Sequence, residues 1–188
     1  MEWILKRRSI RRFLPKPVNR QDLVSLVQAA SFAPSAGNGQ PWEFILVDDV
    51  RTVKQVNKNL GWLGGAPEAD QEPTAHVVVL LRNPQMRPAV YADGGAAATT
   101  MCLAAAEKGI GSCWIGSVNK DEVVRALEIP ADLELFAVLA LGYPAEEPVV
   151  TQAGDKPSAK RDAKGVLKVE KRPLKSVCHV SHYGQRLE

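Results

Sequence analysis

The chain has 188 residues, of which 45% are hydrophobic, and this is enough for one domain with a substantial core. Its net charge of +3 is unevenly spread: residues 1–20 carry a net +6 and residues 151–188 a net +5, which leaves −8 between them. No run of about 18 apolar residues is present, and the first twenty residues lack a signal-like apolar stretch, so we expect a cytoplasmic protein without a membrane span.

Helix and strand signals alternate along the first half of the chain. Asn19 is placed to cap a helix with an apolar stripe that ends before residue 34. Residues 34–41 are rich in turn formers and predict a loop. A strand is expected over residues 42–47, followed by a short helix around Val53. The glycines and prolines of residues 61–75 indicate a loop or mobile flap.

The second half continues the alternation. Residues 76–81 form a continuous apolar run that predicts a strand buried on both faces. The alanine-rich residues 90–108 predict the longest helix, whose small residues would let a backbone or a flat ligand approach closely. A short strand is expected at residues 112–115, then a helix capped by Asn119, then a strand over residues 135–141. This order favours an α+β or α/β sandwich.

The last residues differ from the rest. Residues 145–188 are polar and interrupted by prolines, and they show no helical periodicity. We therefore expect a single domain over residues 1–188 whose C-terminal part is an extended strap. An arm that reaches across a partner subunit would account for such a strap.

The first chemical candidate is the run Arg7-Arg8-Ser9-Ile10-Arg11. Arginine offers a planar fork of donors to phosphate, and a serine hydroxyl adds another. Arg7 and Arg11 would share a face if the run is helical. A solvated basic segment is the simpler interpretation of this run alone. Nucleic acid is a third, but the basic runs lack interleaved aromatic residues and a helix-turn-helix or zinc-finger pattern.

Three further segments could bind a ligand. The amides of Asn38 and Gln40, in the loop of residues 34–41, suit the edge of a heterocycle, although an ordinary connecting loop has the same composition. The glycine-rich residues 109–116 could bring a bare N–H group to a ring, but they match neither the dinucleotide fingerprint nor the Walker motif. The pair Lys171-Arg172 could complete an anion site with Arg7.

The order of these segments resembles the nitroreductase family. It comprises R-R-S-x-R-x-F at a helix start, P-S-x-x-N-x-Q-P-W before a strand, an alanine-rich helix near Asp93-Gly94, then G-x-G-S-C-W-I-G and K-R-P-L. The likeness extends from about Ile4 to about Val177. It implies a nitroreductase-like α+β fold, with a central, mostly antiparallel sheet flanked by helices. It also implies a homodimer that exchanges C-terminal arms and holds flavin mononucleotide (FMN) at its interface.

The resemblance assigns residues to the cofactor. Arg7, Arg8 and Ser9 would bind the FMN phosphate and ribityl chain, and Arg11 would lie near the pyrimidine edge, where positive charge favours the anionic reduced flavin. The loop that reaches over the ring from the partner subunit would supply Pro34, Ser35, Asn38 and Gln40. The segment near the flavin N5 atom would supply Ile115, Gly116 and Ser117. Lys171 and Arg172 would return to the phosphate.

The implied reaction is a ping-pong reduction of nitroaromatic, quinone or similar electron-poor small molecules by NAD(P)H. The flavin does the chemistry at N5, so we expect no catalytic acid or base from a side chain. Alternatives are a flavin-binding or sensing protein with little turnover, or another reaction of the fold such as dehalogenation, dehydrogenation or flavin breakdown. The region between residues 42 and 77 is shorter than in larger relatives, which leaves the substrate open.

The remaining polar residues carry weaker signals. His179 and His182 beside Cys178 form an incomplete ligand set, so we expect no metal site. Cys113 has no nearby histidine in sequence to activate it, and we expect a packed thiol. His76 opens a buried strand and is interpreted as a structural histidine with satisfied hydrogen bonds.

Overall fold

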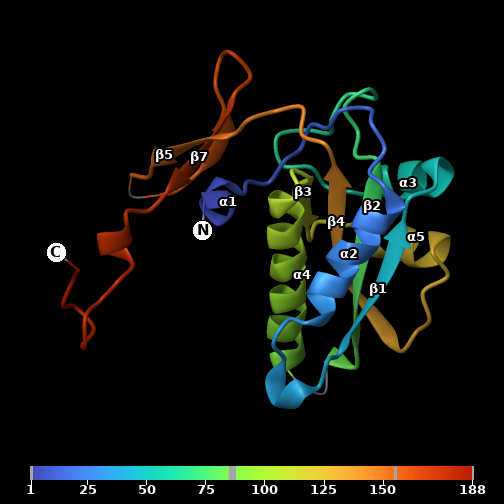
Figure 1. Cartoon of the computed structure of the whole chain (residues 1–188), viewed down its shortest axis with the longest axis horizontal. Coiled ribbons are helices and arrows are strands. Elements are labelled where there is room, and N and C mark those ends of the chain that lie inside the picture. Colours follow the sequence, from blue (N-terminus) through green and yellow to red (C-terminus); the bar gives the residue numbers. More distant parts are fainter. Residues whose placement is uncertain (1, 85–87, 155, 188) are drawn as a thin grey trace. The chain divides into compact units, whose positions relative to one another are not determined.

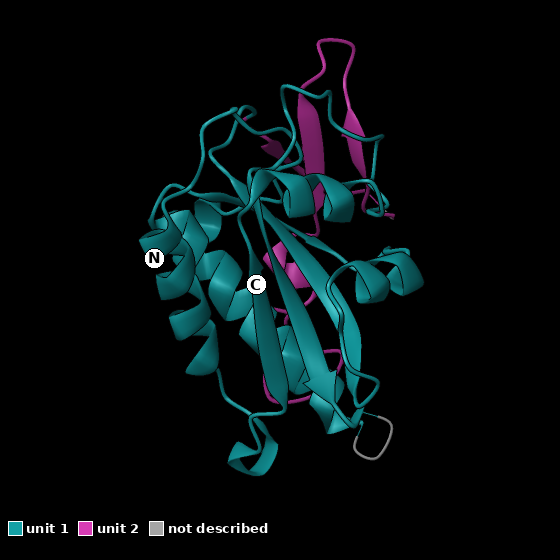
Figure 2. Cartoon of the chain, turned by 90° about the vertical axis from the view of Figure 1, so that its right-hand side faces the viewer, with its two compact units in different colours: residues 1–146 teal, residues 147–188 magenta. Residues whose placement is uncertain are grey.

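A computed structural model describes residues 2–84, 88–154 and 156–187. The chain divides into two compact units, which Figure 2 colours separately. Unit 1 runs to Glu146 and unit 2 begins at Glu147. In the described residues, no helix is both long and apolar enough to cross a bilayer.

Unit 1 is built on a four-stranded sheet. Its strands are β1 (Trp42–Val47), β2 (Ala75–Arg82), β3 (Gly111–Ile115) and β4 (Leu133–Gly142). They lie in the order β1-β2-β4-β3, and every neighbouring pair is antiparallel. The two central strands are almost wholly buried, as continuous apolar sequences predict for strands covered on both faces. The expected α+β fold with an antiparallel sheet is confirmed.

Helices cover both faces of this sheet (Figure 1). One apolar cluster joins α2 (Arg20–Ser31) and α4 (Ala89–Glu107) to one face, through residues such as Leu26, Met101 and Val77. A second cluster packs α3 (Val50–Asn57) and α5 (Lys120–Ala126) on the other face. These positions agree with the helices expected from the sequence.

The small residues of α4 admit side chains from the sheet. A Cβ atom at Gly94 would lie 2.9 Å from Leu81 Cδ2 and 3.2 Å from Phe136, and one at Gly95 would lie 3.5 Å from the Trp114 ring. Trp114 also packs edge-on against Phe136, with ring centroids 5.6 Å apart. At these two glycines the close approach is therefore made by side chains of the sheet.

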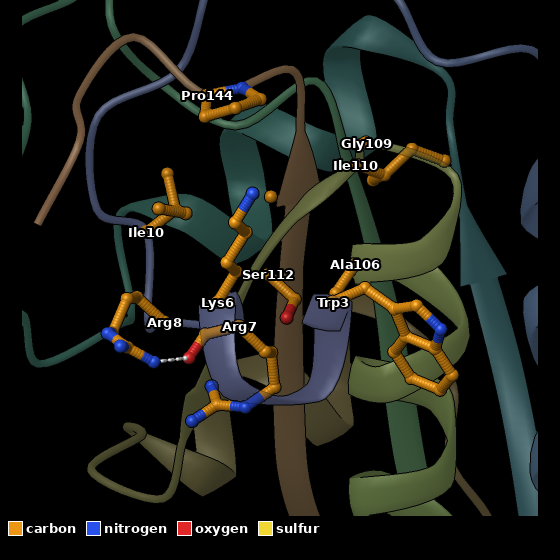
Figure 3. Close-up of a pocket in the computed structure, with 11 residues that line it drawn as sticks. Trp3, Lys6, Arg7, Arg8, Ile10, Ala106, Gly109, Ile110, Ser112 and Pro144 are labelled. Carbon is orange, nitrogen blue, oxygen red and sulfur yellow. Dashed lines mark hydrogen bonds between the residues drawn. The ribbon is translucent and has the colours of Figure 1, made fainter. Parts of the chain in front are cut away.

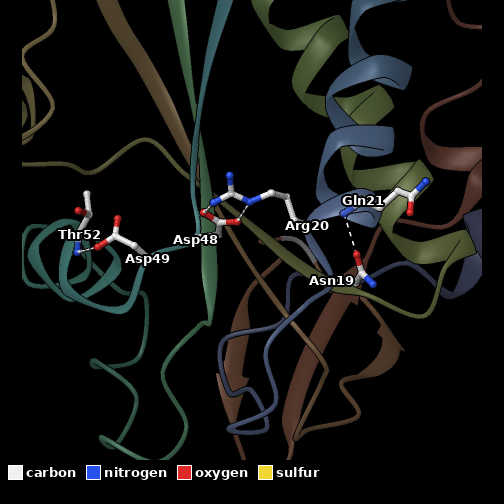
Figure 4. A network of polar contacts seen from close by, with 6 residues as sticks. All are labelled: Asn19, Arg20, Gln21, Asp48, Asp49 and Thr52. Atoms are coloured by element: carbon white, nitrogen blue, oxygen red, sulfur yellow. Dashed lines mark hydrogen bonds and ion pairs between the residues drawn. The ribbon is translucent and has the colours of Figure 1, made fainter.

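Polar side chains fix the ends of α2 and α3 (Figure 4). The Asn19 side chain accepts a hydrogen bond from the Gln21 N–H at 2.8 Å, which confirms the predicted cap. Asp49 caps α3 by accepting from the Thr52 N–H at 2.9 Å, and this bond lowers the pKa of the Asp49 carboxyl. Asn119 precedes α5 but makes no capping bond with its side chain, so that prediction is wrong in this detail.

The basic run is not helical, which corrects the expectation. Helix α1 (Glu2–Lys6) ends before it, and Ser9 pairs instead with Ser112 on the edge strand β3. The Ile10 N–H donates to the Ser112 carbonyl at 2.9 Å. Gly111 makes room for this strand-like approach, since a Cβ there would meet Ile10 at 3.0 Å. The backbone hydrogen bonds of the sheet edge therefore outweigh any local helical tendency.

Unit 2 contains strands that were not predicted from the sequence. These are β5 (Val149–Gln152), β6 (Ala159–Arg161) and β7 (Leu167–Lys171), and they are followed by the single turn η3 (Leu174–Ser176). The order is β5-β7-β6, with β5 parallel and β6 antiparallel to β7. Each strand is short and carries few apolar residues, so period-two alternation was too brief to recognise.

Candidate functional site

A basic pocket lies beside the start of β3. It has a volume of about 190 Å³, and Figure 3 shows the residues around it. The N-terminal segment contributes Trp3, Lys6, Arg7 and Arg8, while the opposite wall comes from the end of α4 and from residues 109–112. The structure thus brings two of the predicted phosphate ligands to one cavity. Ser9 does not line the cavity but pairs with Ser112, which does.

Arg8 brings a positive charge to this pocket. Its Nη1 donates to the carbonyls of Leu5 and Arg7, both at 2.6 Å. Its Nε is buried and has no hydrogen-bond partner among the described residues. Burial and the neighbouring charge of Arg7 lower the pKa of the Arg8 guanidinium. A buried donor without a partner, next to a second guanidinium, fits a bound anion.

A second cavity, the strand-end pocket, lies at the other end of β3. Its volume is about 150 Å³, and Arg11 lines it together with Ile115, Gly116 and Ser117. These four predicted site residues therefore meet in one place. A Cβ atom at Gly116 would have no heavy atom within 4 Å, so the backbone there is open to a flat group.

The wall that closes this pocket consists of residues that were not predicted from the sequence. Gly61, Trp62 and Leu63 line it from the segment between α3 and β2. The Gly61 N–H donates to the Ser117 carbonyl at 2.7 Å, and a Cβ at Gly61 would lie 2.3 Å from Ser117 Oγ. Next to this hydrogen bond, Leu60 forms an isolated antiparallel bridge with Val118. The only sequence signal was the glycine content of residues 61–75, which predicted a loop but no partner for it.

The Cys113 thiol also lines the strand-end pocket. It is buried, and this burial raises its pKa to about 11. A thiol with that pKa is almost wholly protonated at neutral pH and is a poor nucleophile. The expected packed thiol agrees with the structure.

The loop of residues 34–41, which was predicted to cover the ring, lies away from both pockets. The Ala36 N–H donates to Asp93 Oδ1 at 2.9 Å, which fixes the loop to the first turns of α4. Gln40 Nε2 donates to Asn38 Oδ1 at 3.2 Å. The predicted residues line neither the basic pocket nor the strand-end pocket: Pro34, Ser35, Asn38 and Gln40. Ala106 lines the basic pocket, and Asp93 lies thirteen positions earlier on the same helix. The loop is therefore fixed about 20 Å along α4 from that pocket.

Lys171 and Arg172 belong to unit 2, at and just after the end of β7. Arg172 Nη2 donates to the Ser176 carbonyl at 2.9 Å. A role of the pair at the phosphate stays a prediction.

His76 differs from the expectation. It is fully buried on β2, but neither ring nitrogen has a hydrogen-bond partner of normal geometry among the described residues. Burial lowers its pKa to about 4, against a smaller opposing effect of the Val53 backbone. His76 is therefore a structural histidine held neutral in the core, as predicted, but the described residues give neither ring nitrogen the expected hydrogen bond of normal geometry. Near the C-terminus, His179 stacks on Tyr183 with ring centroids 4.4 Å apart.

The two pockets define an elongated site along β3. A five-residue strand separates its ends by about 14 Å. One end offers two guanidinium groups to an anion, and the other offers exposed backbone and one arginine to a flat ring. This arrangement matches the shape of a flavin mononucleotide, which has a phosphate at one end and a flat ring system at the other.

The sequence of residues 4–143 matches the family described as the Nitroreductase family. The chain belongs to the nitroreductase family. An Archaeoglobus fulgidus relative named as an NADH dehydrogenase/NAD(P)H nitroreductase is 33% identical, over 83% of this chain and 91% of its own. The 5,6-dimethylbenzimidazole synthase of Rhodospirillum rubrum is 30% identical, over 75% and 80% respectively.

Solved nitroreductase structures share the fold. The FMN-dependent nitroreductase of Clostridium difficile R20291 superposes with a TM-score of 0.68 and 25% identity, over 81% of this chain and 91% of its own. The family match ends at residue 143, so it covers the sheet, the strand-end pocket and most of the basic pocket, but not unit 2.

Proposed function

We propose that this nitroreductase-family chain reduces nitroaromatic, quinone or similar electron-poor acceptors at the expense of NAD(P)H. As a member of this family, the chain is an FMN-dependent NAD(P)H oxidoreductase. The observation that carries the site assignment is the placement of the two pockets at opposite ends of β3, one with paired arginines and one with open backbone. Bound FMN would supply the redox chemistry, namely hydride transfer from NAD(P)H and electron transfer to the acceptor.

The basic pocket would hold the phosphate. Arg7 and Arg8 supply charge there, and the unpartnered Arg8 Nε is a donor that an anion would satisfy. Charged hydrogen bonds to phosphate are shorter and stronger than neutral ones, and arginine can make two at once. The protein would thus anchor the cofactor at its charged end.

The strand-end pocket would hold the ring system. Gly116 leaves the backbone open, so a flat ring can approach without meeting a side chain. Arg11 places a permanent positive charge at the same pocket, which would favour the negative charge of the reduced cofactor. Trp62 and Leu63 would then limit which acceptors reach the exposed face of the ring.

The remaining predicted contacts call for a second copy of the chain. Asn38 and Gln40 line neither pocket of their own subunit, and their loop is fixed about 20 Å along α4 from the basic pocket. A homodimer with its sites at the interface would bring this loop to the partner's ring. Sedimentation of the FMN-loaded protein tests this proposal, which predicts a dimer; a stable FMN-loaded monomer would contradict it.

The proposed reaction is tested by anaerobic mixing of the yellow, FMN-loaded protein with NADH or NADPH. The flavin absorbance should bleach on a timescale of seconds or less, and it should return when a quinone or a nitroaromatic compound is added. Steady-state rates at several donor and acceptor concentrations should give parallel double-reciprocal lines, as a ping-pong mechanism requires. Slow bleaching by both nucleotides would reject the proposal.

A different flavin reaction is the second candidate. It is favoured by the 30% identity to a protein named as a 5,6-dimethylbenzimidazole synthase, which shows that membership of the family does not fix the substrate. The same mixing experiment separates the two candidates. A flavin that another reductant reduces quickly, but that NADH and NADPH do not, would favour the second.

A further inference from the structure

The segment that contains Arg11 is held by the chain that leaves the central sheet. Phe13 pairs with Pro144, the Leu14 N–H donates to the Tyr143 carbonyl at 2.8 Å, and the Ala145 N–H donates to the Arg12 carbonyl at 2.9 Å. These bonds form a short antiparallel ladder between residues 12–14 and 143–145. The ladder ends at Arg12, next to Arg11, the residue that lines the strand-end pocket.

A carboxylate completes the ladder at this end. The Arg11 N–H donates to Glu146 Oε1 at 2.6 Å, across 135 positions of sequence. Hydrogen bonds between a backbone N–H and a carboxylate are stronger than neutral ones, because the acceptor is charged. Glu146 therefore fixes the backbone from which the Arg11 side chain projects, and it places a negative charge beside that residue.

The charge of Glu146 acts on a residue that lines the strand-end pocket, Cys113. Cys113 lines this pocket, and burial is the main reason that its pKa is raised to about 11. Among the smaller effects, Arg11 lowers the Cys113 pKa while Glu146 raises it. The two opposite charges thus act on the same buried group from nearby positions.

We propose that Glu146 is a positioning residue that fixes Arg11 beside the flavin ring and whose negative charge lowers the midpoint potential of bound FMN. The proposal rests on the proposed function in one respect, namely the placement of the ring in the strand-end pocket. Reduced FMN carries more negative charge than oxidised FMN, so a nearby carboxylate disfavours reduction and a nearby guanidinium favours it. Arg11 and Glu146 then set the potential in opposite directions.

Two substitutions separate the charge of Glu146 from its hydrogen bond. Glu146→Gln keeps an oxygen acceptor for the Arg11 N–H but removes the charge, so it should shift the midpoint potential upward and change the affinity for oxidised FMN by less than about twofold. Glu146→Asp keeps the charge but shortens the side chain. It should leave the potential near that of the wild type and weaken FMN binding by about two- to tenfold, the range of one hydrogen bond.

The experiment measures the midpoint potential of the FMN-loaded full chain by equilibration with a reference dye, and the FMN affinity by fluorescence. Glu147→Gln is the matched control, since it removes the same charge from the next, exposed residue and should leave the potential unchanged. Arg11→Gln should lower the potential.

The outcomes separate this proposal from the placement of the ring. If Arg11→Gln lowers the potential but Glu146→Gln leaves it at the wild-type value, the role of Glu146 is overturned and the placement of the ring stands. If neither substitution moves the potential, the ring does not lie in the strand-end pocket and both proposals fail. Loss of FMN binding by Glu146→Gln would also overturn the proposal, because the amide retains the acceptor.

Discussion

The basic pocket and the strand-end pocket lie at the two ends of one strand but are built differently. The basic pocket presents side-chain charge, from Arg7 and Arg8, at a place fixed by α1 and the end of α4. The strand-end pocket combines open backbone at Gly116 with side chains such as Arg11 and Trp62, and it is closed by a loop that pairs with Ser117. Anion binding depends on residue type, whereas the approach of a ring depends on the absence of side chains.

The two pockets should therefore respond differently to substitution. A change of residue type in the basic pocket should alter affinity for the phosphate and leave the fold intact. A change at the glycines of the strand-end pocket should alter packing or access to the ring.

The largest effect is expected at Gly61. In Gly61→Ala the new methyl group would lie 2.3 Å from Ser117 Oγ and 3.1 Å from the Ser117 carbonyl oxygen, so the two paired segments must separate. We expect a loss of up to about 3 kcal/mol in the free energy of unfolding, measured by urea denaturation.

Gly116→Ala is the matched control for this substitution. Its methyl group meets no protein atom within 4 Å, so the stability should stay within about 1 kcal/mol of the wild type while affinity for both FMN and riboflavin falls. Equal stabilities of the two variants would show that the loop does not pack on Ser117 in solution.

Acid should weaken the sheet beneath both pockets through His76. The His76 pKa is about 4 in the folded chain and about 6.5 in the unfolded chain, so the unfolded state binds the proton first as the pH falls. Stability is unaffected by this group above about pH 7, and it decreases as the pH falls toward 4. At pH 5 the loss from this one group is about 2 kcal/mol.

His76→Leu should remove that part of the pH dependence. Urea unfolding of both proteins at pH 7 and pH 5 measures it, and the variant should lose less stability between the two values than the wild type does. The same loss in both proteins would show that His76 is not held neutral in the folded chain.

A smaller effect is expected at Asp93, which holds the loop of residues 34–41. Asp93→Ala leaves the Ala36 N–H without its acceptor, at a cost of about 1 kcal/mol, while Asp93→Asn keeps an acceptor oxygen and should cost less. Because this loop is proposed to cover the partner's ring, Asp93→Ala should weaken FMN and riboflavin binding by the same factor. A loss confined to FMN would place the loop at the phosphate instead.

The sequence predicted the sheet and its helices well, because their signals are local. The apolar run of β2 and the cap at Asn19 are visible in short windows, and both agree with the structure. The arginine pair of the basic pocket was also recognised, since guanidinium chemistry is a property of the residues themselves.

Features that depend on distant pairings were missed or wrong. The basic run was expected to be helical, but hydrogen bonding to Ser112, about a hundred positions away, holds it in an extended form. The hydrogen bonds of Gly61 with Ser117 and of Arg11 with Glu146 also join residues far apart in the sequence, and neither was predicted. His76 looked like a satisfied histidine because its partners could be known only from the packing of the core around it.

The central claim is that one FMN lies along β3 with its phosphate at Arg7. The most direct test compares the affinities of FMN and riboflavin, which differ only in the phosphate, for the wild type and for Arg7→Ala. The wild type should prefer FMN strongly, and Arg7→Ala should lose about 1.5 to 3 kcal/mol of FMN binding, while its riboflavin affinity stays unchanged. An unchanged FMN affinity in Arg7→Ala, or an equal loss for both ligands, would contradict it.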